Sequence, residues 1–342
     1  MAPGRGRRRE TGTVTGTLIL AGDIGGTHTR LVLAPADDIR SWRNERRYAS
    51  GDYADFDALL ADYLQCCESP PARACLAIAG PVLGPSDQSR AQVTNLPWQL
   101  DSRRLAERHG LERVHLVNDF AAIGHALDAL QPADLACLQT GWPRTGANRA
   151  VIGAGTGLGH ASVVACAGGL EVLAAEAGHT DFAPRTPLQR DLLQMLAAEL
   201  DTVSWERLVS GPGLVRLYLF FCRRGDAVPG IDPEAADAAA RISAAAIAGT
   251  DPAAAQALRE FVRLYGAQAG NWALCTLPFA GLFIAGGIAP RILDWLRRPD
   301  FLAAFHAKGP MRELMQGLPV HVITHPQPGL LGALQLAART SA

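Results

Sequence analysis

The stretch Thr17-Leu-Ile-Leu-Ala-Gly-Asp-Ile-Gly-Gly-Thr-His-Thr-Arg-Leu-Val-Leu33 consists of an apolar run, a glycine-rich turn with a threonine, and a second apolar run. The same design returns in Ala150-Val-Ile-Gly-Ala-Gly-Thr-Gly-Leu-Gly-His-Ala-Ser-Val-Val164. Apolar, β-branched runs on both sides of a tight turn predict two strands joined as a hairpin. Successive backbone N–H groups in such a turn form a concavity that suits phosphate. The repeat therefore predicts a duplicated fold whose two halves hold one nucleotide between them.

Two better-known phosphate-binding motifs do not fit these turns. A P-loop requires a lysine after its second glycine, and neither turn contains one. A dinucleotide fingerprint requires G-x-G-x-x-G, but counting from Gly153 or Gly155 the third glycine position holds Leu158 or His160. The residues after Gly159 also favour a strand over the required helix. Two ordinary hairpins with glycine turns remain the alternative.

Length and composition indicate a soluble protein of two domains. The 342 residues exceed what one hydrophobic core usually supports. With 48% hydrophobic and 19% charged residues, the composition is that of a globular chain. A net charge of −1 creates no field that would attract nucleic acid or an anionic membrane, and no apolar run reaches the ~18 residues of a membrane-spanning helix. We expect neither nucleic acid nor a membrane as a partner.

The N-terminus and the cysteines bear on where the protein works. Residues 1–16 contain several arginines among Gly, Pro and Thr without the apolar core of a secretory signal, which predicts a disordered basic tail. A nucleic-acid-binding arm is a weaker alternative, because no aromatic residues accompany the arginines. The seven cysteines are odd in number and show no C-x-x-C spacing, which argues against a disulfide framework and against structural zinc. We therefore expect a reducing compartment, the cytoplasm.

The rest of the chain alternates predicted strands and helices, which is typical of α/β proteins. Beyond the two hairpins, strands are expected at 74–79, 114–117, 281–285 and 320–324. Helices are expected at 56–66, from a cap at Asp101 to 109, and at 120–130, 187–200, 214–223, 233–249, 252–274 and 328–338.

Asn118 and Asp119 stand where the strand at 114–117 meets the helix at 120–130. In open α/β sheets ligands bind at the carboxyl ends of the strands. There Asp119 could act as a general base that removes a proton from the hydroxyl attacking a phosphoryl group. The competing interpretation is that Asp119 only caps the helix.

Three further polar residues could bind a polyhydroxylated ligand. Glu176 and His179 lie in a glycine-flanked loop, and Glu206 shortly precedes Ser-Gly-Pro-Gly. Buried sugar hydroxyls need both donors and acceptors, which carboxylates and imidazole supply. A solvated surface turn is an equally good interpretation of each residue alone, and the absence of H-x-x-x-H spacing makes a metal site a poorer one.

Two more candidates concern the nucleotide and its metal. The pair Gly286-Gly287 follows an apolar strand and resembles strand-to-helix turns that receive an adenosine, although a tight helix contact would also require glycine. Asp23 in the first turn is a candidate indirect ligand of Mg²⁺, because this ion keeps waters between itself and protein carboxylates.

Six motifs together resemble the proteobacterial-type ATP-dependent glucokinases, which belong to the hexokinase and actin-like ATPase superfamily. In chain order they are Gly22-Asp-Ile-Gly-Gly-Thr27, Val117-Asn-Asp-Phe120, Gly153-Ala-Gly-Thr-Gly-Leu-Gly159, Glu176-Ala-Gly-His179, Glu206-Arg-Leu-Val-Ser-Gly-Pro-Gly213 and Phe283-Ile-Ala-Gly-Gly-Ile288. The resemblance spans residues 18–336. Each motif is weak alone, whereas six in the family's order are very specific. The relatives that carry a cysteine-rich zinc motif or a helix-turn-helix extension are less similar, because this chain has neither.

The resemblance implies an α/β protein with the two-domain actin-like ATPase (ribonuclease H-like) fold and an interdomain cleft. The small domain would comprise residues 17–129 and 325–342, and the large domain residues 130–324. It further implies a glucokinase that transfers the γ-phosphoryl group of ATP to the 6-hydroxyl of D-glucose, with ATP and Mg²⁺ as cofactors. A homodimer is also a family expectation.

The resemblance also implies roles for individual residues. Asp119 would be the base, and it would hold the sugar together with Asn118, Glu176, His179 and Glu206. The nucleotide would contact Gly22, Asp23, Ile24, Gly25, Gly26, Thr27, Gly155, Thr156, Gly157, Gly286 and Gly287, and Asp23 would hold the metal through water. The chain departs from the family pattern at His28, where asparagine is usual, and at Ala177, where glycine is common. A kinase of another hexose or of an N-acetylhexosamine, or a non-catalytic sugar sensor, remain alternatives.

Overall fold

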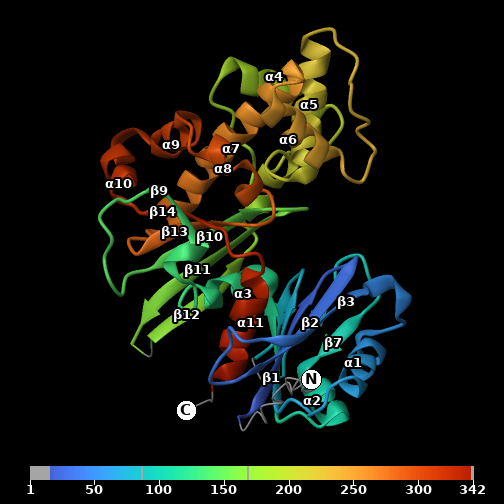
Figure 1. Ribbon diagram of the computed structural model, residues 1–342. Coiled ribbons are helices and arrows are strands. Elements are labelled where there is room, and N and C mark those ends of the chain that lie inside the picture. Colours follow the sequence, from blue (N-terminus) through green and yellow to red (C-terminus); the bar gives the residue numbers. More distant parts are fainter. Residues whose placement is uncertain (1–15, 86–87, 168, 340–342) are drawn as a thin grey trace, which may run out of the picture. The chain divides into compact units, whose positions relative to one another are not determined.

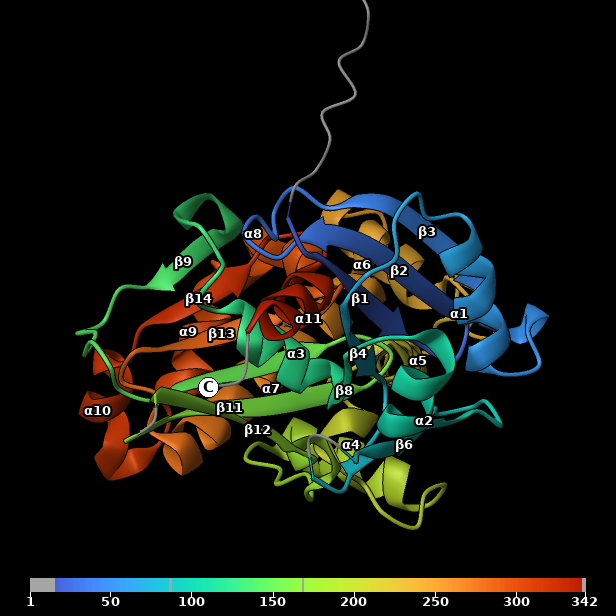
Figure 2. The ribbon, with the colours of Figure 1, turned by 90° about the horizontal axis from the view of Figure 1, so that it is seen from below.

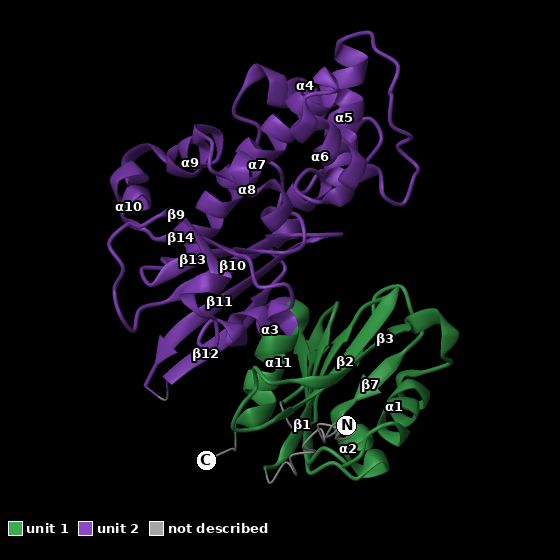
Figure 3. Cartoon of the chain, viewed as in Figure 1, with its two compact units in different colours: residues 1–119, 330–342 green, residues 120–329 purple. Residues whose placement is uncertain are grey.

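The computed structural model describes residues 16–85, 88–167 and 169–339 (Figure 1). The chain forms two compact units, shown in different colours in Figure 3. Unit 1 contains the chain up to Asp119 and from Leu330 onward, and unit 2 is Phe120–Gly329. The basic tail expected over residues 1–16 lies, apart from Gly16, outside the described residues. The domain limits implied by the resemblance stay a prediction.

Unit 1 is built on a sheet with the strand order β3-β2-β1-β4-β8. Strand β2 runs antiparallel to both β1 and β3, whereas β1, β4 and β8 are parallel. The strands are β1 (Leu18–Ile24), β2 (His28–Pro35), β3 (Arg43–Ala49), β4 (Arg73–Ile78) and β8 (Arg113–Asn118), and a small antiparallel sheet adds β5 (Val82–Leu83), β6 (Arg90–Gln92) and β7 (Gln99–Asp101). The first predicted hairpin is therefore confirmed as β1 and β2.

Unit 2 repeats this topology in a sheet with the order β12-β11-β10-β13-β14-β9. Strand β11 is antiparallel to β10 and β12, whereas β10, β13 and β14 are parallel. The strands are β9 (Leu135–Gln139), β10 (Arg149–Ala154), β11 (Leu158–Cys166), β12 (Gly169–Ala175), β13 (Gly281–Ala285) and β14 (Val320–Ile323). Five strands thus match those of unit 1 one for one, and the predicted duplication extends from the hairpins to the whole sheets.

In unit 1 both faces of the sheet are covered by helices. Alternate residues of a strand point to opposite faces. Leu20 on β1 packs with α1 (Phe56–Gln65) and α2 (Ser102–His109). Its neighbour Ala21 packs with α11 (Pro328–Ala338) on the other face.

The sheet of unit 2 is also covered on both faces. Ile152 on β10 belongs to the large core around α5 (Gly211–Arg224), α7 (Pro252–Thr276) and α9 (Pro299–His306), whereas Val151 packs with α3 (Asp119–Ala126). Figure 2 shows α3 on the near face of the sheet and α7 beyond it. The remaining helices are α4 (Pro187–Ala197), α6 (Ala238–Ala248), α8 (Leu293–Leu296) and α10 (Arg312–Gly317). No helix within the described residues is both long and apolar enough to cross a bilayer.

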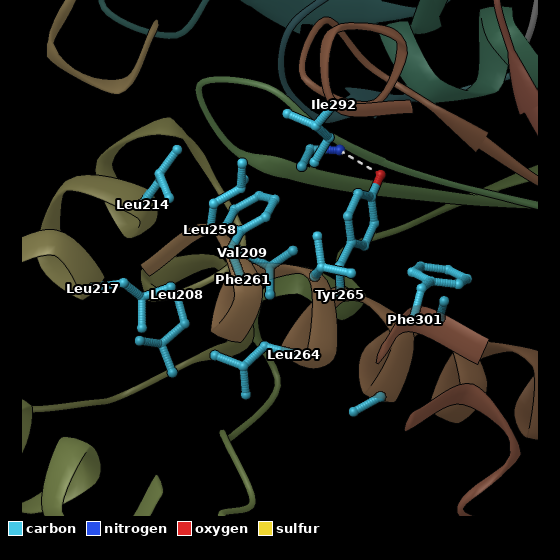
Figure 4. Packing of buried hydrophobic residues seen from close by; sticks show 14 of the residues in the cluster. Leu208, Val209, Leu214, Leu217, Leu258, Phe261, Leu264, Tyr265, Ile292 and Phe301 are labelled. Atoms are coloured by element: carbon cyan, nitrogen blue, oxygen red, sulfur yellow. Dashed lines mark hydrogen bonds between the residues drawn. The ribbon is translucent and has the colours of Figure 1, made fainter. Parts of the chain in front are cut away.

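The core of unit 2 is centred on α7. Phe261, Leu264 and Tyr265 of this helix lie among leucines of α5 and Phe301 of α9 (Figure 4). The hydroxyl of Tyr265 accepts a hydrogen bond of 3.0 Å from the backbone N–H of Ala154, at the end of β10. The apolar stripe on α7 is therefore a core face, and it fixes the start of the second glycine turn.

Each unit contains one helix that directly follows, in the chain, a strand of the other unit. Helix α3 follows β8 of unit 1 but packs on the sheet of unit 2, and α11 follows β14 of unit 2 but packs on the sheet of unit 1. The chain passes between the units at Asp119/Phe120 and at Gly329/Leu330. The candidate base Asp119 is therefore the last residue of unit 1 before the chain enters unit 2.

Most predicted helices are confirmed, with two corrections. The helix expected over 120–130 ends at Ala126. The helix expected over 233–249 is wrong in its first part, because α6 begins only at Ala238. A turn precedes it, in which the side chain of Asp232 accepts from the N–H of Glu234. Such local side-chain bonds compete with helix formation. The strands β3, β9 and β12 were not predicted, and these edge strands lack a buried apolar alternation.

Phe120 is seated on two glycines of the second hairpin. Gly153 and Gly159 face each other across β10 and β11. A Cβ atom on Gly159 would overlap the ring of Phe120, and one on Gly153 would lie 2.8 Å from its Cε1. Only residues without a side chain leave room for this ring. These two glycines therefore serve packing within unit 2.

We expect Gly159→Ala to lower the free energy of unfolding by roughly 2–3 kcal/mol, because the added methyl group displaces the Phe120 ring. Urea denaturation measures the change. Gly51→Ala is the matched control, since a Cβ there meets nothing within 4 Å. Adding Phe120→Leu should restore part of the loss in the Gly159→Ala background. Equal stability of the two alanine variants would contradict the packing role.

A second prediction concerns the stability of the folded protein at acidic pH. His160 on β11 is fully buried and packs edge-to-face on Trp272 with ring centroids 5.2 Å apart. Burial lowers the pKa of His160 from 6.5 to about 4. Below pH 6.5 the unfolded chain binds a proton that the folded protein does not, so stability falls as the pH drops from about 6.5 to about 4. The loss is on the order of 3 kcal/mol. Thermal unfolding of His160→Phe should lack this component, and identical pH profiles would contradict it.

Candidate active site

The turn between β1 and β2 is held in shape by Ser50. The N–H of Gly25 donates to the carbonyl of His28 at 3.0 Å and closes the turn. Ser50 Oγ donates to the carbonyl of Gly25 at 2.9 Å, and Ser50 N–H donates to that of Thr27 at 3.0 Å. Carbonyls satisfied in this way leave the turn a fixed shape. Sequence reasoning missed Ser50, which belongs to none of the motifs.

The other predicted residues of this turn differ in exposure. Gly22 and Ile24 are buried in β1, and the Ile24 side chain is part of the core, so only their backbone can contact a ligand. Asp23 and Thr27 are exposed, and Gly26 is half-buried with its Cβ direction blocked by the Thr94 carbonyl at 2.6 Å. The side chain at the family departure His28 is exposed.

Asn118 and Asp119 lie at the same edge of the unit 1 sheet as this turn. Ile24, Ile78 and Asn118 are aligned across β1, β4 and β8, so the residues after each leave the sheet together. Asn118 Nδ2 donates to the carbonyl of Gly80 at 3.2 Å and fixes the loop that follows β4. Helix α3 begins at Asp119 itself, which puts this carboxylate in the first helical turn, where the helix dipole favours negative charge.

The turn between β10 and β11 is open on one side. Gly155 N–H donates to the carbonyl of Gly157, and Gly211 N–H donates to that of Gly155, both at 2.8 Å. A Cβ on Gly155 would meet nothing within 4 Å, and Thr156 is exposed. This part of the turn is the one accessible to a ligand.

Gly155 and Thr156 line a cavity of about 740 Å³ in unit 2, together with Gly287. This volume is within the range of pockets for drug-sized ligands. The predicted Gly286 lies just behind, with φ +82° and its Cβ direction against the carbonyl of Ala154. The other lining residues are Glu199, Gly211, Pro212, Leu214, Val215, Arg216, Leu219, Pro233, Glu234, Ala235, Ala236, Asp237, Ala238, Ala239, Ala240, Ser243, Ile288, Arg291 and Ile292.

The cavity wall combines small apolar side chains with a few polar ones. Alanines of α6 and the turn before it give a smooth surface, and Arg216 and Arg291 add positive charge. Burial and the charge of Arg207 lower the pKa of Arg216, which stays a cation at neutral pH. The alanine run from 235 onward was the sequence signal for this wall, but sequence reasoning interpreted it only as a helix.

Glu206 supports the second turn from the other side. Its Oε2 accepts a hydrogen bond of 2.9 Å from the N–H of Leu158. A Cβ on Gly157 would lie 2.5 Å from the same oxygen, so glycine there lets the carboxylate approach. The predicted residues Gly157 and Glu206 are therefore brought into direct contact.

The Glu176–His179 segment lies against the same residue, Leu158. Gly178 is buried, and its Cβ direction points into the carbonyl of Leu158. Glu176 and His179 keep 65% and 62% of their side chains exposed, with Oε2 and Nε2 3.8 Å apart. The segment thus presents a carboxylate and an imidazole to solvent beside the turn that carries Glu206.

The structure brings together predicted residues within each unit. In unit 2 one turn joins the cavity, through Gly155 and Thr156, to the polar residues Glu176, His179 and Glu206. In unit 1 Asp23, the last residue but one of β1, and Asp119, which follows β8, lie at the same edge of the sheet. No cluster of three or more His, Cys, Asp or Glu side chains that could hold a metal ion occurs in the part of the chain that is described.

Comparison with known proteins identifies the family of this chain. The glucokinase family model matches residues 20–340. A glucokinase of Trichormus variabilis is 42% identical over 94% of this chain and 99% of its own. The crystal structure of a glucokinase from an Antarctic psychrotroph has a TM-score of 0.81 at 31% identity, covering 94% and 99% of the two chains.

A more distant solved structure is the ROK family glucokinase from Streptomyces griseus in complex with glucose and AMPPNP. It has a TM-score of 0.65 at 21% identity, and the match covers 94% of this chain and 99% of that one, which shows the shared fold. The α/β fold of the actin-like ATPase type expected from the sequence is confirmed. The matches extend over nearly the whole chain, and this protein belongs to the glucokinase family.

Proposed function

We propose that this chain is an ATP-dependent glucokinase that converts D-glucose and ATP into glucose 6-phosphate and ADP. The observation that carries the proposal is the β10–β11 turn. One side of it lines the 740 Å³ cavity, and the other contacts Glu206 and the Glu176–His179 segment. A nucleotide in the cavity would therefore direct its phosphates toward residues suited to a sugar.

In the proposed reaction Asp119 accepts the proton of the glucose 6-hydroxyl. The hydroxyl oxygen then bonds to the γ-phosphorus while the bond to the bridging oxygen of ADP breaks. Asn118, Glu176, His179 and Glu206 hold the other hydroxyls, since their carboxylate, amide and imidazole groups supply the required donors and acceptors. Phosphoryl transfer of this kind depends on positioning and charge neutralisation.

The nucleotide contacts follow the two glycine turns. We assign the phosphates to the two turns within residues 22–27 and 155–157, beside the backbone hydrogen bonds that close them, and the nucleoside to the cavity next to Gly286 and Gly287. Mg²⁺ would be held by Asp23 through water and would neutralise charge on the phosphates. Solvent reaches Asp23, and a bound Mg²⁺ would favour the ionised carboxylate against the surrounding burial, which raises the pKa of Asp23 while Arg30 opposes the shift.

One turnover assay distinguishes the three possible functions of this protein. Coupled ADP release is measured with ATP and glucose, mannose, fructose or N-acetylglucosamine, and the formation of sugar phosphate is measured when ADP or polyphosphate replaces ATP as the phosphoryl donor. A glucokinase shows the highest kcat/KM with glucose and ATP. Preference for another sugar would favour a different hexose kinase, and binding without sugar-dependent turnover would identify a sensor.

Two further expectations concern the protein in the cell. Its substrates and the free thiols of its seven cysteines fit the reducing cytoplasm, which fractionation would test. A homodimer stays a prediction, for which light scattering at micromolar concentration is the direct measurement.

We expect Asp119→Asn to lower kcat by on the order of 10² or more, because the amide cannot accept the proton. Glucose affinity, measured by calorimetry, should change much less. Asp55→Asn is the matched control, since Asp55 is also a carboxylate at a helix start, where it accepts from the N–H of Ala58 at 2.8 Å. Turnover of Asp119→Asn within tenfold of the wild type would refute the base assignment.

We expect Ala239→Phe to raise the KM for ATP about tenfold or more, because the ring fills part of the cavity. The KM for glucose should stay within twofold. Ala244→Phe places the same ring on α6 at an exposed position outside the cavity lining and serves as the control. A parallel loss of ATP affinity in both variants would argue against a nucleotide in this cavity.

A further inference from the structure

Lys308 is the only lysine in a chain with 32 lysine and arginine residues, and it is buried. It follows α9, and 9% of the residue is exposed. Ammonium groups are rarely buried, because they lose their hydration. Lys308 Nζ donates instead to two neutral oxygens, the Ala267 carbonyl at 2.7 Å and Asn271 Oδ1. Both acceptors belong to α7.

The fold provides a specific place for this side chain. A Cβ on Gly270 of α7 would overlap Lys308 Cε, so the lysine stem lies against bare helix backbone. A single methylene chain ending in a compact ammonium group fits such a slot, whereas the planar fork of arginine is wider. The slot beside Gly270 therefore favours lysine over arginine.

Lys308 is the first donor in a series of hydrogen bonds in which each side chain accepts from the residue before it and donates to the next. Because an ammonium group only donates, Asn271 must turn its Oδ1 toward Lys308. Asn271 Nδ2 then donates to Gln268 Oε1 at 3.0 Å, and Gln268 Nε2 donates to the carbonyl of Ala177 at 3.2 Å. Gln268 is 2% exposed, so the hydrogen bonds of its side chain are shielded from water.

The chain of bonds ends on the segment that carries Glu176 and His179. The carbonyl of Ala177 also accepts from Thr180 Oγ1 at 2.8 Å. Gln268 therefore ties the middle of this short segment to the rigid α7, while the two polar side chains remain exposed on either side.

We propose that Lys308, Asn271 and Gln268 form a positioning relay that fixes the Glu176–His179 segment and thereby sets the affinity for the sugar. The relay rests on the proposed function, in which Glu176 and His179 hold glucose. None of its three residues touches the substrate in this scheme, and each acts through the segment.

The protonation state of Lys308 gives an observable that reports on the relay. Burial and the charge of Arg185, which precedes α4, lower the pKa of Lys308 to about 7, and Cys275 on α7 opposes the shift. A neutral amine can accept as well as donate, so deprotonation removes the constraint on the direction of the relay. Because the chain has one lysine, ¹³Cε-labelled lysine gives a single side-chain NMR signal for this titration.

The kinetic experiment compares Lys308→Met, Gln268→Leu and the double variant in the full chain. Each single change should raise the KM for glucose about tenfold, with the KM for ATP and kcat within twofold. The double variant should match the single ones, since both break the same relay. Tyr218→Phe is the control, because it removes a buried hydroxyl that binds Asp251 and Gly230 outside the relay. Additive effects, or equal effects on glucose and ATP, would overturn the proposal.

Hydrogen exchange supplies a test that needs no activity. The amides of residues 177–180 should exchange faster in Gln268→Leu than in Tyr218→Phe, and the lysine signal should shift when glucose binds the wild type. Unchanged exchange would refute the relay even if Lys308→Met failed to fold. Absence of sugar-dependent turnover in the wild type would instead refute the proposed function, while the exchange data still decide whether the relay holds the segment.

Discussion

The candidate site of unit 2 depends on the two backbone groups of Leu158. Its N–H is bound by the Glu206 carboxylate, its carbonyl lies against Gly178, and its side chain is 4% exposed in the core. A hydrogen bond to an ionised acceptor is stronger than a neutral one. One residue thus holds together loops that are far apart in the sequence. Glu206 consequently has a structural task in addition to the sugar contact proposed for it.

Each glycine of the second motif is required for a different physical reason. Gly155 faces open space beside the cavity, as expected of a residue that a phosphate approaches. Gly157 makes room for a carboxylate and Gly159 for an aromatic ring. A glycine-rich signature therefore combines ligand approach with close packing. The packing members place Phe120, the residue directly after Asp119, on the same hairpin that carries the open turn.

Local patterns predicted local structure well. The Asp101 cap, the two hairpins and the helix at 252–274 follow from short-range chemistry, and the structure confirms them. Partners far apart in the chain were not predictable. Nothing near Glu206 indicates that its carboxylate binds Leu158 N–H, and a lone lysine does not reveal that it is buried against Gly270. The polar edge strand β3 escaped notice because its side chains are mostly exposed.

The order of the elements along the chain also constrains how the protein can fold during its synthesis. One face of the unit 1 sheet, with Ile19, Val32 and Cys75, is covered by residues of α11 such as Leu334. That helix begins at Pro328, after nearly all of unit 2, so a nascent polypeptide carries this apolar face unprotected while unit 2 is translated. Such surfaces promote aggregation before folding is complete. Unit 1, whose sheet precedes unit 2 in the chain, is thus completed only after unit 2 has been synthesised.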